Sequence, residues 1–136
     1  MKEKKLLDEK DVNIRFNVLA IILIIIFCFA MSPVTLQNDT FYTVKIGEHI
    51  MENGIDMKDP FSWHEDLDYT YPHWLYDVIT YLIYSAFGMM GIYITTCILA
   101  CILGVLIYRV NCKIAKNKVL SFVITLGVIY LIRGYI

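Results

Sequence analysis

Three long runs of apolar residues dominate the sequence and predict its architecture. The first covers residues 18–34 and carries no charge, the second covers 92–108, and the third lies within 119–136. A helix needs about 20 residues to cross the apolar core of a bilayer. The runs therefore predict an all-α integral membrane protein with about three transmembrane helices, of which 119–136 is only a partial span.

The segment 35–91, between the first two runs, is predicted to hold one or two shorter amphipathic helices. In 41–53, apolar residues such as Tyr42, Ile46 and Ile50 recur at helical spacing, and Asn53-Gly54 is a typical helix stop. This helix is too short and too charged to span a bilayer. We expect it to lie flat at the outer interface, with its apolar side toward lipid.

The second amphipathic helix is predicted over 73–87. Leu75, Ile79 and Leu82 follow the spacing of one helix face, and Asp77 lies on the opposite side. A carboxylate inside the bilayer is costly, so we expect Asp77 to remain in water. Two glycines, Gly88 and Gly91, are predicted to break the helix before the span at 92–108.

The distribution of basic residues orients the predicted spans. The segment 35–73 has two lysines against eight acids, whereas the tail 1–17 and the loop 109–118 are rich in basic residues. Basic residues mark the cytoplasmic side. The chain is thus predicted to be a multi-pass protein of the cell membrane, with a cytoplasmic N-terminus and loop 109–118 and an extracytoplasmic segment 35–91.

The first apolar run has an alternative interpretation as a cleaved signal peptide, because Ala30-Met31-Ser32 is a weak cleavage-like triplet. The leading segment is long for a signal peptide and has mixed charge. Two further apolar runs also follow it. These features favour an uncleaved anchor.

Composition narrows the classes of protein. Hydrophobic residues make up 58% of the 136 positions, charged residues only 18%, and the formal net charge is −1. These values exclude a disordered chain, disfavour a soluble domain and give no indication of nucleic-acid binding. Three of the four cysteines, Cys28, Cys97 and Cys101, fall in predicted spans, where we expect them to act as small packing residues.

Segment 35–91 contains several short motifs, which are Asp39-Thr40-Phe41-Tyr42, Lys45, Gly47-Glu48, Ile50, Asn53-Gly54-Ile55, Asp59-Pro60-Phe61-Ser62-Trp63, His73-Trp74-Leu75 and the pair Gly88 and Gly91. Together they resemble the first external loop of the C-type membrane glycosyltransferases, a superfamily that includes the dolichyl-phosphate-mannose–protein mannosyltransferases. The resemblance covers about residues 15–110.

This resemblance implies a polytopic helical enzyme that transfers a sugar from a polyprenyl-phosphate donor to an acceptor on the outer face of the membrane. It implies two partners, the lipid bilayer and the lipid-linked donor, and an essential acid at the position of Asp39. Many relatives have a second acid where this chain has Thr40. The family has about nine or more spans, so the chain looks like its N-terminal portion, completed by further transmembrane helices of the same or a partner chain. Activity of this portion alone is then not expected.

A chemical argument that does not depend on the resemblance also indicates Asp39 as a catalytic residue. Transfer to a hydroxyl needs a carboxylate that accepts its proton, and Asp39 follows the first apolar run closely, near the depth of a lipid phosphate. The alternative role of Asp39 is to stabilise the start of the helix that follows. As substrate-binding residues we single out Trp63, His73 and Trp74.

Those aromatic residues have an alternative place in the interfacial belt of a membrane protein. Arg133 is a further substrate-binding candidate, as a partner for the donor phosphate, with snorkelling as its alternative. No cofactor and no metal site are predicted. A divalent cation held by Asp66, Asp68 and His64 or His73 is left open, although a solvated acidic turn is the favoured interpretation.

An alternative function belongs to another class. The chain would then be a small non-catalytic membrane protein that acts as an accessory or interaction subunit through its interfacial helices. The sequence past Ile136 would distinguish the two readings.

Overall fold

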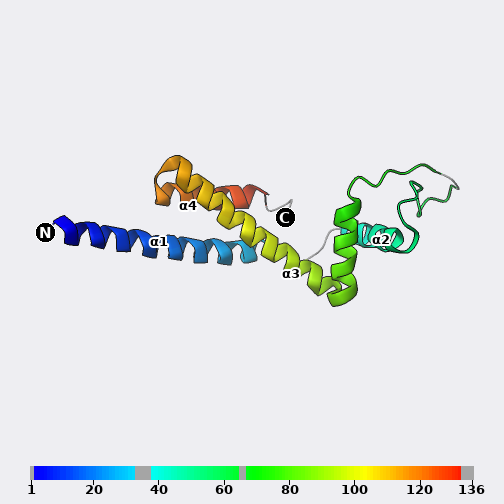
Figure 1. Cartoon of the computed structure of the whole chain (residues 1–136), viewed down its shortest axis with the longest axis horizontal. Helices are drawn as coiled ribbons and strands as arrows, with labels where there is room; N and C mark the ends of the chain where they lie inside the picture. The colour runs from blue at the N-terminus through cyan, green and yellow to red at the C-terminus, as the bar shows by residue number, and fades with distance from the viewer. Residues whose placement is uncertain (1, 33–37, 65–66, 133–136) are drawn as a thin grey trace. The chain divides into compact units, whose positions relative to one another are not determined.

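In the computed structural model, the described residues are 2–32, 38–64 and 67–132, and most of them are helical. The elements in chain order are α1 (Lys2–Met31), α2 (Asn38–Asn53), α3 (Trp74–Ala115) and α4 (Lys118–Ile132) (Figure 1). Within these ranges there is no strand, only an isolated antiparallel bridge between Lys58 and Asp68. The predicted all-α class is therefore confirmed for this part of the chain.

Two of the helices are long and apolar enough to cross a membrane. They are the Asp11–Met31 part of α1, with 21 residues, and α3, with 42 residues. At 1.5 Å per residue, the first of these is about 30 Å long, the thickness of a bilayer core. Helix α4 is apolar but has only 15 residues. The three predicted spans are thus reduced to two candidates, and the role of α4 stays a prediction.

The apolar runs underestimate how far the helices extend. Helix α1 begins at Lys2, so residues 2–17 of the predicted tail are part of the same helix. Helix α3 continues to Ala115, and the predicted loop 109–118 shrinks to a turn at Lys116 and Asn117. Charged residues end an apolar pattern without ending a helix, because most of them have good helix propensity.

Helix α3 is interrupted at one of the two glycines predicted to break it. Gly88 has φ 64° and ψ −160°, a conformation open almost only to glycine. Gly91 is wrong as a breaker, because the helix continues through it. A Cβ atom at Gly91 would lie 2.5 Å from Cβ of Phe87, so this glycine allows a close contact instead.

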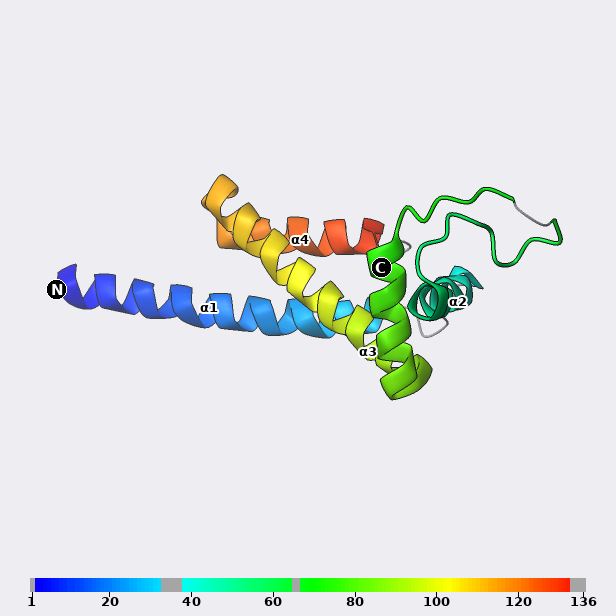
Figure 2. The same ribbon diagram turned by 45° about the vertical axis from the view of Figure 1, so that its right-hand side comes forward.

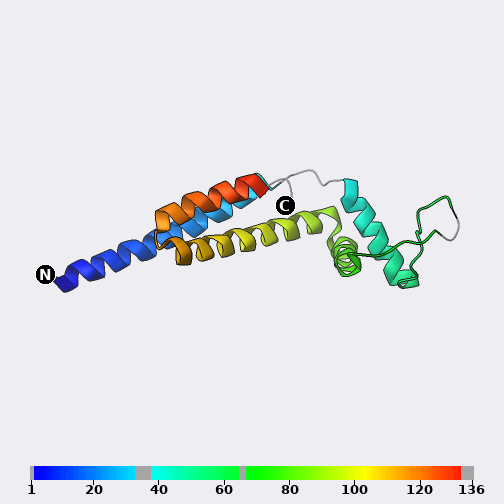
Figure 3. The same cartoon turned by 90° about the horizontal axis from the view of Figure 1, so that it is seen from above.

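The chain divides into two compact units, which we describe separately. Unit 1 comprises Met1–Pro33 and Thr95–Ile136. Its core joins three helices, with α1 and α4 running alongside each other (Figure 3). The buried members of that core are Ala20, Ile24, Cys28, Ala100, Tyr108 and Ile129.

Small residues allow the helices of unit 1 to approach closely. A Cβ atom at Gly104 would lie 2.9 Å from Sγ of Cys28, and that sulfur lies 3.5 Å from the carbonyl oxygen of Ala100. Cys97 is also buried. Close packing of small residues is a common way to join membrane helices.

Several uncharged polar side chains of unit 1 are buried, and many of its large apolar side chains are exposed. Ser121 and Thr125 are fully buried, and the side-chain amide of Asn111 donates a 3.1 Å hydrogen bond to Oγ1 of Thr125. Exposed apolar side chains cover the outer surface, among them Ile22, Ile26, Leu99, Ile102, Leu106 and Val123. This distribution suits a lipid surround better than water.

Unit 2 comprises Val34–Ile94. It contains α2, the first part of α3 and a connecting segment, 54–73, whose described residues 54–64 and 67–73 form two extended arms (Figure 2). The Lys58–Asp68 bridge joins these arms, with hydrogen bonds of 2.9 Å from the Asp59 amide to the Leu67 carbonyl and from the Tyr69 amide to the Met57 carbonyl.

Candidate functional site

The candidate site lies in unit 2, where α2 contacts the start of α3 at a glycine. A Cβ atom at Gly47 would lie only 2.2 Å from the carbonyl oxygen of Asp77 and 2.7 Å from Cβ of Tyr81. The backbones of the two helices therefore meet without a side chain between them. Ile46, from the predicted apolar side of α2, and Val44 beside it are buried within the protein, so the prediction that this side faces lipid is wrong at Ile46.

The prediction that Asp77 stays in water is wrong. Asp77 is only 8% exposed, and Thr80, one turn further, is also buried. Both residues belong to the side of α3 that α2 covers, because Gly47 contacts the Asp77 backbone. Leu75, Ile79 and Leu82, on the opposite side, are exposed. The polar side of this part of α3 thus packs against α2, and its apolar side is exposed.

The connecting segment is organised around the carboxylate of Asp56. Its Oδ1 accepts hydrogen bonds from the Tyr71 hydroxyl at 2.9 Å and from the Lys58 backbone amide at 3.2 Å. The Tyr71 hydroxyl lies also 2.7 Å from the Lys58 carbonyl oxygen. The Lys58 amide, the Tyr71 hydroxyl and His49 together hold the pKa of Asp56 below its usual value.

His49 ties the same carboxylate to α2. Its Nε2 lies 3.3 Å from Oδ2 of Asp56, and the Asn53 amide nitrogen lies 3.1 Å from its Nδ1. An amide that donates to Nδ1 leaves the proton on Nε2, which then donates to Asp56. The His49 ring also stacks on Tyr71, with 6.4 Å between centroids. Burial and the bond to Asp56 raise the pKa of Tyr71 to about 12.

Aromatic rings extend this cluster along the connecting segment. Tyr69 meets Tyr71 edge to face at 5.1 Å, and Tyr42 of α2 meets Phe61 at 5.6 Å. A shallow depression of about 340 Å³ lies beside them, lined by Met57, Asp68, Tyr69 and Thr70. Edge contacts of this kind favour a fixed arrangement of rings. The segment is therefore a folded surface rather than a simple linker.

The predicted catalytic residue, Asp39, lies one helical turn before Tyr42 and takes no part in the hydrogen bonds of Asp56. Asp39 occupies the first turn of α2 and is exposed. A carboxylate there is favoured by the positive end of the helix dipole. The position fits both interpretations of Asp39, as a base open to solvent and as a residue that stabilises the helix start.

The predicted substrate-binding residues are accessible but are not gathered into one pocket. Trp63 is fully exposed, His73 is exposed, and Trp74 is 47% exposed at the start of α3. In the described part of the chain, no hydrogen bond or ring contact joins any of them to Asp39. Arg133 lies outside the described residues, so its role stays a prediction.

The open question of a divalent cation has little support in the described part of the chain. Asp66 lies outside that part, and no group of three His, Cys, Asp or Glu residues elsewhere in it is arranged to hold a metal ion.

Sequence reasoning missed the role of Asp56 as the centre of the connecting segment. The sequence contained a weak indication, because the side chain of an Asp in a turn often accepts a hydrogen bond from the backbone amide two residues later. Asp59 makes the same local contact, accepting a 2.9 Å bond from the Phe61 amide. The partners His49 and Tyr71 come from distant positions that this local signal does not reach.

Comparison with known proteins adds no identification. No family model matches the sequence, and no significant match was found among curated proteins or solved structures. The functional argument therefore depends on the residues of this chain and on the loop motifs quoted above.

Proposed function

We propose that the chain forms the N-terminal part of a polytopic membrane glycosyltransferase, which moves a sugar from a polyprenyl-phosphate donor to an acceptor at the outer face of the membrane. One observation carries the proposal. Asp39 is an exposed carboxylate in the first turn of a helix that follows the apolar helix α1, which ends at Met31.

The proposed chemistry assigns one step to Asp39. Its carboxylate accepts the proton of the acceptor hydroxyl while that oxygen forms a bond to the anomeric carbon of the sugar. The bond between the anomeric carbon and the phosphate oxygen breaks at the same time. Polyprenyl phosphate leaves with the bonding electron pair. The exposure of Asp39 supports this role, because a base must be within reach of its substrate.

Trp63, His73 and Trp74 are proposed to contact the sugar or the prenyl chain. All three are open to solvent in unit 2, and none is committed to the interior. An indole ring offers a flat apolar face to a sugar, and an imidazole offers a hydrogen bond to a hydroxyl or phosphate. Arg133 keeps its proposed role toward the donor phosphate.

The membrane setting is proposed with a cytoplasmic N-terminus and an outer unit 2. Both candidate spans carry exposed apolar side chains, which support contact with lipid. On α3 they include Leu75, Ile79 and Leu82. The loop of basic residues at the α3–α4 turn and the acidic composition of 35–73 support the orientation. Helices beyond this chain would complete the enzyme.

The test is transfer of radiolabel in membranes that contain the protein as its own gene encodes it. The probes are polyprenyl-phosphate mannose and polyprenyl-phosphate glucose with labelled sugars. The expected result is transfer that Asp39→Asn reduces by roughly 100-fold or more, as loss of a general base does. Glu52→Gln, which removes an exposed acid from the other end of α2, is the matched control and should transfer normally.

Two results would overturn the proposal. One is normal transfer by an Asp39→Asn protein that is inserted at wild-type level. The other is no transfer from either donor by the wild-type protein, a result that would favour the accessory function.

A further inference from the structure

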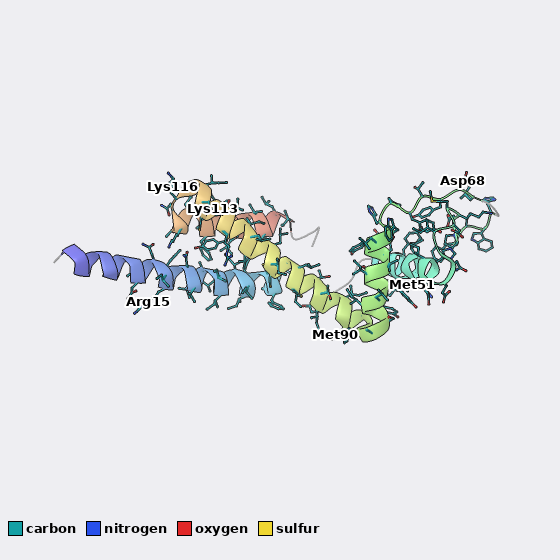
Figure 4. All side chains as sticks on the ribbon, in the orientation of Figure 1. Arg15, Met51, Asp68, Met90, Lys113 and Lys116 are labelled. Atoms are coloured by element: carbon teal, nitrogen blue, oxygen red, sulfur yellow. The ribbon has the colours of Figure 1, made fainter. Side chains whose placement is uncertain are left out.

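Basic side chains gather at one end of unit 1, a cluster that we call the basic end. Helix α4 begins beside α1, because Nζ of Lys118 donates a 3.1 Å hydrogen bond to the backbone carbonyl of Asn13. Figure 4 shows Lys113 and Lys116 where α3 turns into α4, and Arg15 on the side of α1 away from these two lysines. The basic end comprises Arg15 of α1, Arg109 and Lys113 of α3, Lys116 of the turn and Lys118 of α4.

The basic end has a clear excess of positive charge. Asp11 is the only acid in 11–32 and 95–132, the parts of unit 1 whose side chains are described. Arg15, Arg109, Lys113 and Lys116 are all exposed. Arg109 and Lys113 are one helical turn apart, so they share a face of α3. Among the described side chains of 11–32 and 95–132, the end therefore presents several cationic groups against a single acid.

One of these lysines occupies a position that normally favours glycine. Lys116 has φ 54°, in the left-handed region, at the end of α3. A residue with a side chain is strained there, and glycine is the usual choice. Asn117 then caps the start of α4, where its side-chain oxygen accepts 3.1 Å hydrogen bonds from the amides of Val119 and Leu120. Placing a lysine in this turn keeps a charge at the tip of the basic end.

Exposed apolar side chains border the same charges. Ile114 is 75% exposed between Lys113 and Lys116, and Val110 and Val119 are more than half exposed. These exposed apolar side chains would not contribute to the binding of a nucleic acid or of a soluble anion. A phospholipid matches both features, since its phosphate fits the cations and its acyl chains fit the apolar side chains below them.

We infer that the basic end binds the headgroups of anionic phospholipids. Juxtamembrane basic residues attract anionic lipids over about one Debye length. The inference is independent of the proposed sugar transfer, because it uses residues of unit 1 alone. It assigns selectivity for lipid charge to the turn between α3 and α4.

The test is competition between two lipids for the purified full chain in detergent, read by native mass spectrometry. The probes are phosphatidylglycerol and phosphatidylcholine with identical acyl chains, at equal concentration. The wild-type chain should bind phosphatidylglycerol preferentially, and the preference should fall as salt is raised. Lys113→Gln with Lys116→Gln should reduce the preference by at least fivefold, where fivefold corresponds to roughly 1 kcal/mol, the typical contribution of one basic residue.

Matched variants separate charge from folding. Lys113→Arg with Lys116→Arg retains the charge and should retain the preference. Lys45→Gln with Lys58→Gln removes two charges from unit 2 and should also leave the preference unchanged. Helix content by circular dichroism checks that each variant folds.

The inference is overturned if the wild-type chain binds both lipids equally or if the double glutamine variant, correctly folded, keeps its preference. Inorganic phosphate in millimolar excess provides a further arm. It should leave the bound phosphatidylglycerol in place. Displacement by phosphate alone would identify a simple anion site and would contradict recognition of a lipid.

Discussion

The hydroxyl of Tyr108 on α3 donates a 2.9 Å hydrogen bond to the side-chain oxygen of Asn17 on α1, across 91 positions of sequence. Tyr108 is almost completely buried. In an apolar surround, a polar atom that loses its partner has no water to replace it. This pair therefore fixes the relation of α1 to α3 in unit 1 more specifically than apolar contacts do.

We predict that Tyr108→Phe destabilises unit 1 by about 1 kcal/mol, because hydrogen bonds between membrane helices contribute roughly 0.6 to 2 kcal/mol. The measurement is unfolding in mixed micelles at increasing denaturant. Asn17→Ala should cost a similar amount, and the double variant should cost less than the sum of the two. Strict additivity would show that the two side chains do not interact.

Gly47→Ala should separate α2 from α3. The new methyl group would meet the Asp77 carbonyl oxygen at 2.2 Å, and backbone atoms cannot move aside as a flexible side chain can. We expect a loss of roughly 1–3 kcal/mol in the stability of unit 2. Protease cleavage within 54–73 would report it as a faster rate.

Gly127→Ala is the matched control for that substitution. Gly127 lies within α4, and nothing lies within 4 Å of the place where its Cβ would be. Alanine there should stabilise the helix by up to about 1 kcal/mol. Equal cleavage rates for the Gly47→Ala and wild-type proteins would contradict the close contact between α2 and α3.

The connecting segment should lose its order in acid because of Asp56. The pKa of Asp56 is lower in the folded protein than its usual value of 3.8, so its bonds stabilise the segment fully above that value. The contribution disappears as the pH falls from about 4 through the lowered pKa. The amide resonance of Lys58, which donates to Asp56, should shift over this range.

Asp56→Asn should remove that pH dependence while it weakens the segment at neutral pH. Asp68→Asn, on the opposite arm, is the control and should retain the wild-type profile. A Lys58 resonance that is unchanged down to pH 2 in the wild-type protein would contradict the role of Asp56.

The orientation of the chain is tested with single cysteines. The four native cysteines are replaced by alanine, and one cysteine is introduced at Thr70 or at Lys116. A membrane-impermeant maleimide should label position 70 in intact cells, and position 116 only after permeabilisation. The reverse pattern would show that unit 2 faces the cytoplasm.

The helices could be predicted from the sequence largely because each depends on its own residues. The apolar runs placed α1, α3 and α4, and the pattern of 41–53 placed α2, which begins three residues earlier, at Asn38. Helix ends were less well predicted. The end of α3 depends on a left-handed lysine and on the Asn117 cap, which no apolar pattern records.

The relations between elements could not be predicted in the same way. Asp77 looked like a residue of a water-facing side, because periodicity shows that a helix has two sides without showing which medium each meets. Its burial follows from the glycine at position 47, which admits α2 to that side. The contacts of Asp56 with His49 and Tyr71 depend likewise on the path of 54–73. For the candidate site, the sequence led to Asp39, Trp63, His73 and Trp74, whose catalytic and binding roles stay predictions.

The first part of α3 buries polar side chains and exposes apolar ones, and this arrangement has a practical consequence. The buried residues are Asp77 and Thr80, and the exposed ones are Leu75, Ile79 and Leu82. In a buffer without detergent or lipid, the exposed apolar surfaces of different molecules would associate, and the protein would aggregate. Any assay of this protein therefore needs a detergent micelle or a lipid nanodisc, and the choice between them becomes an experimental variable.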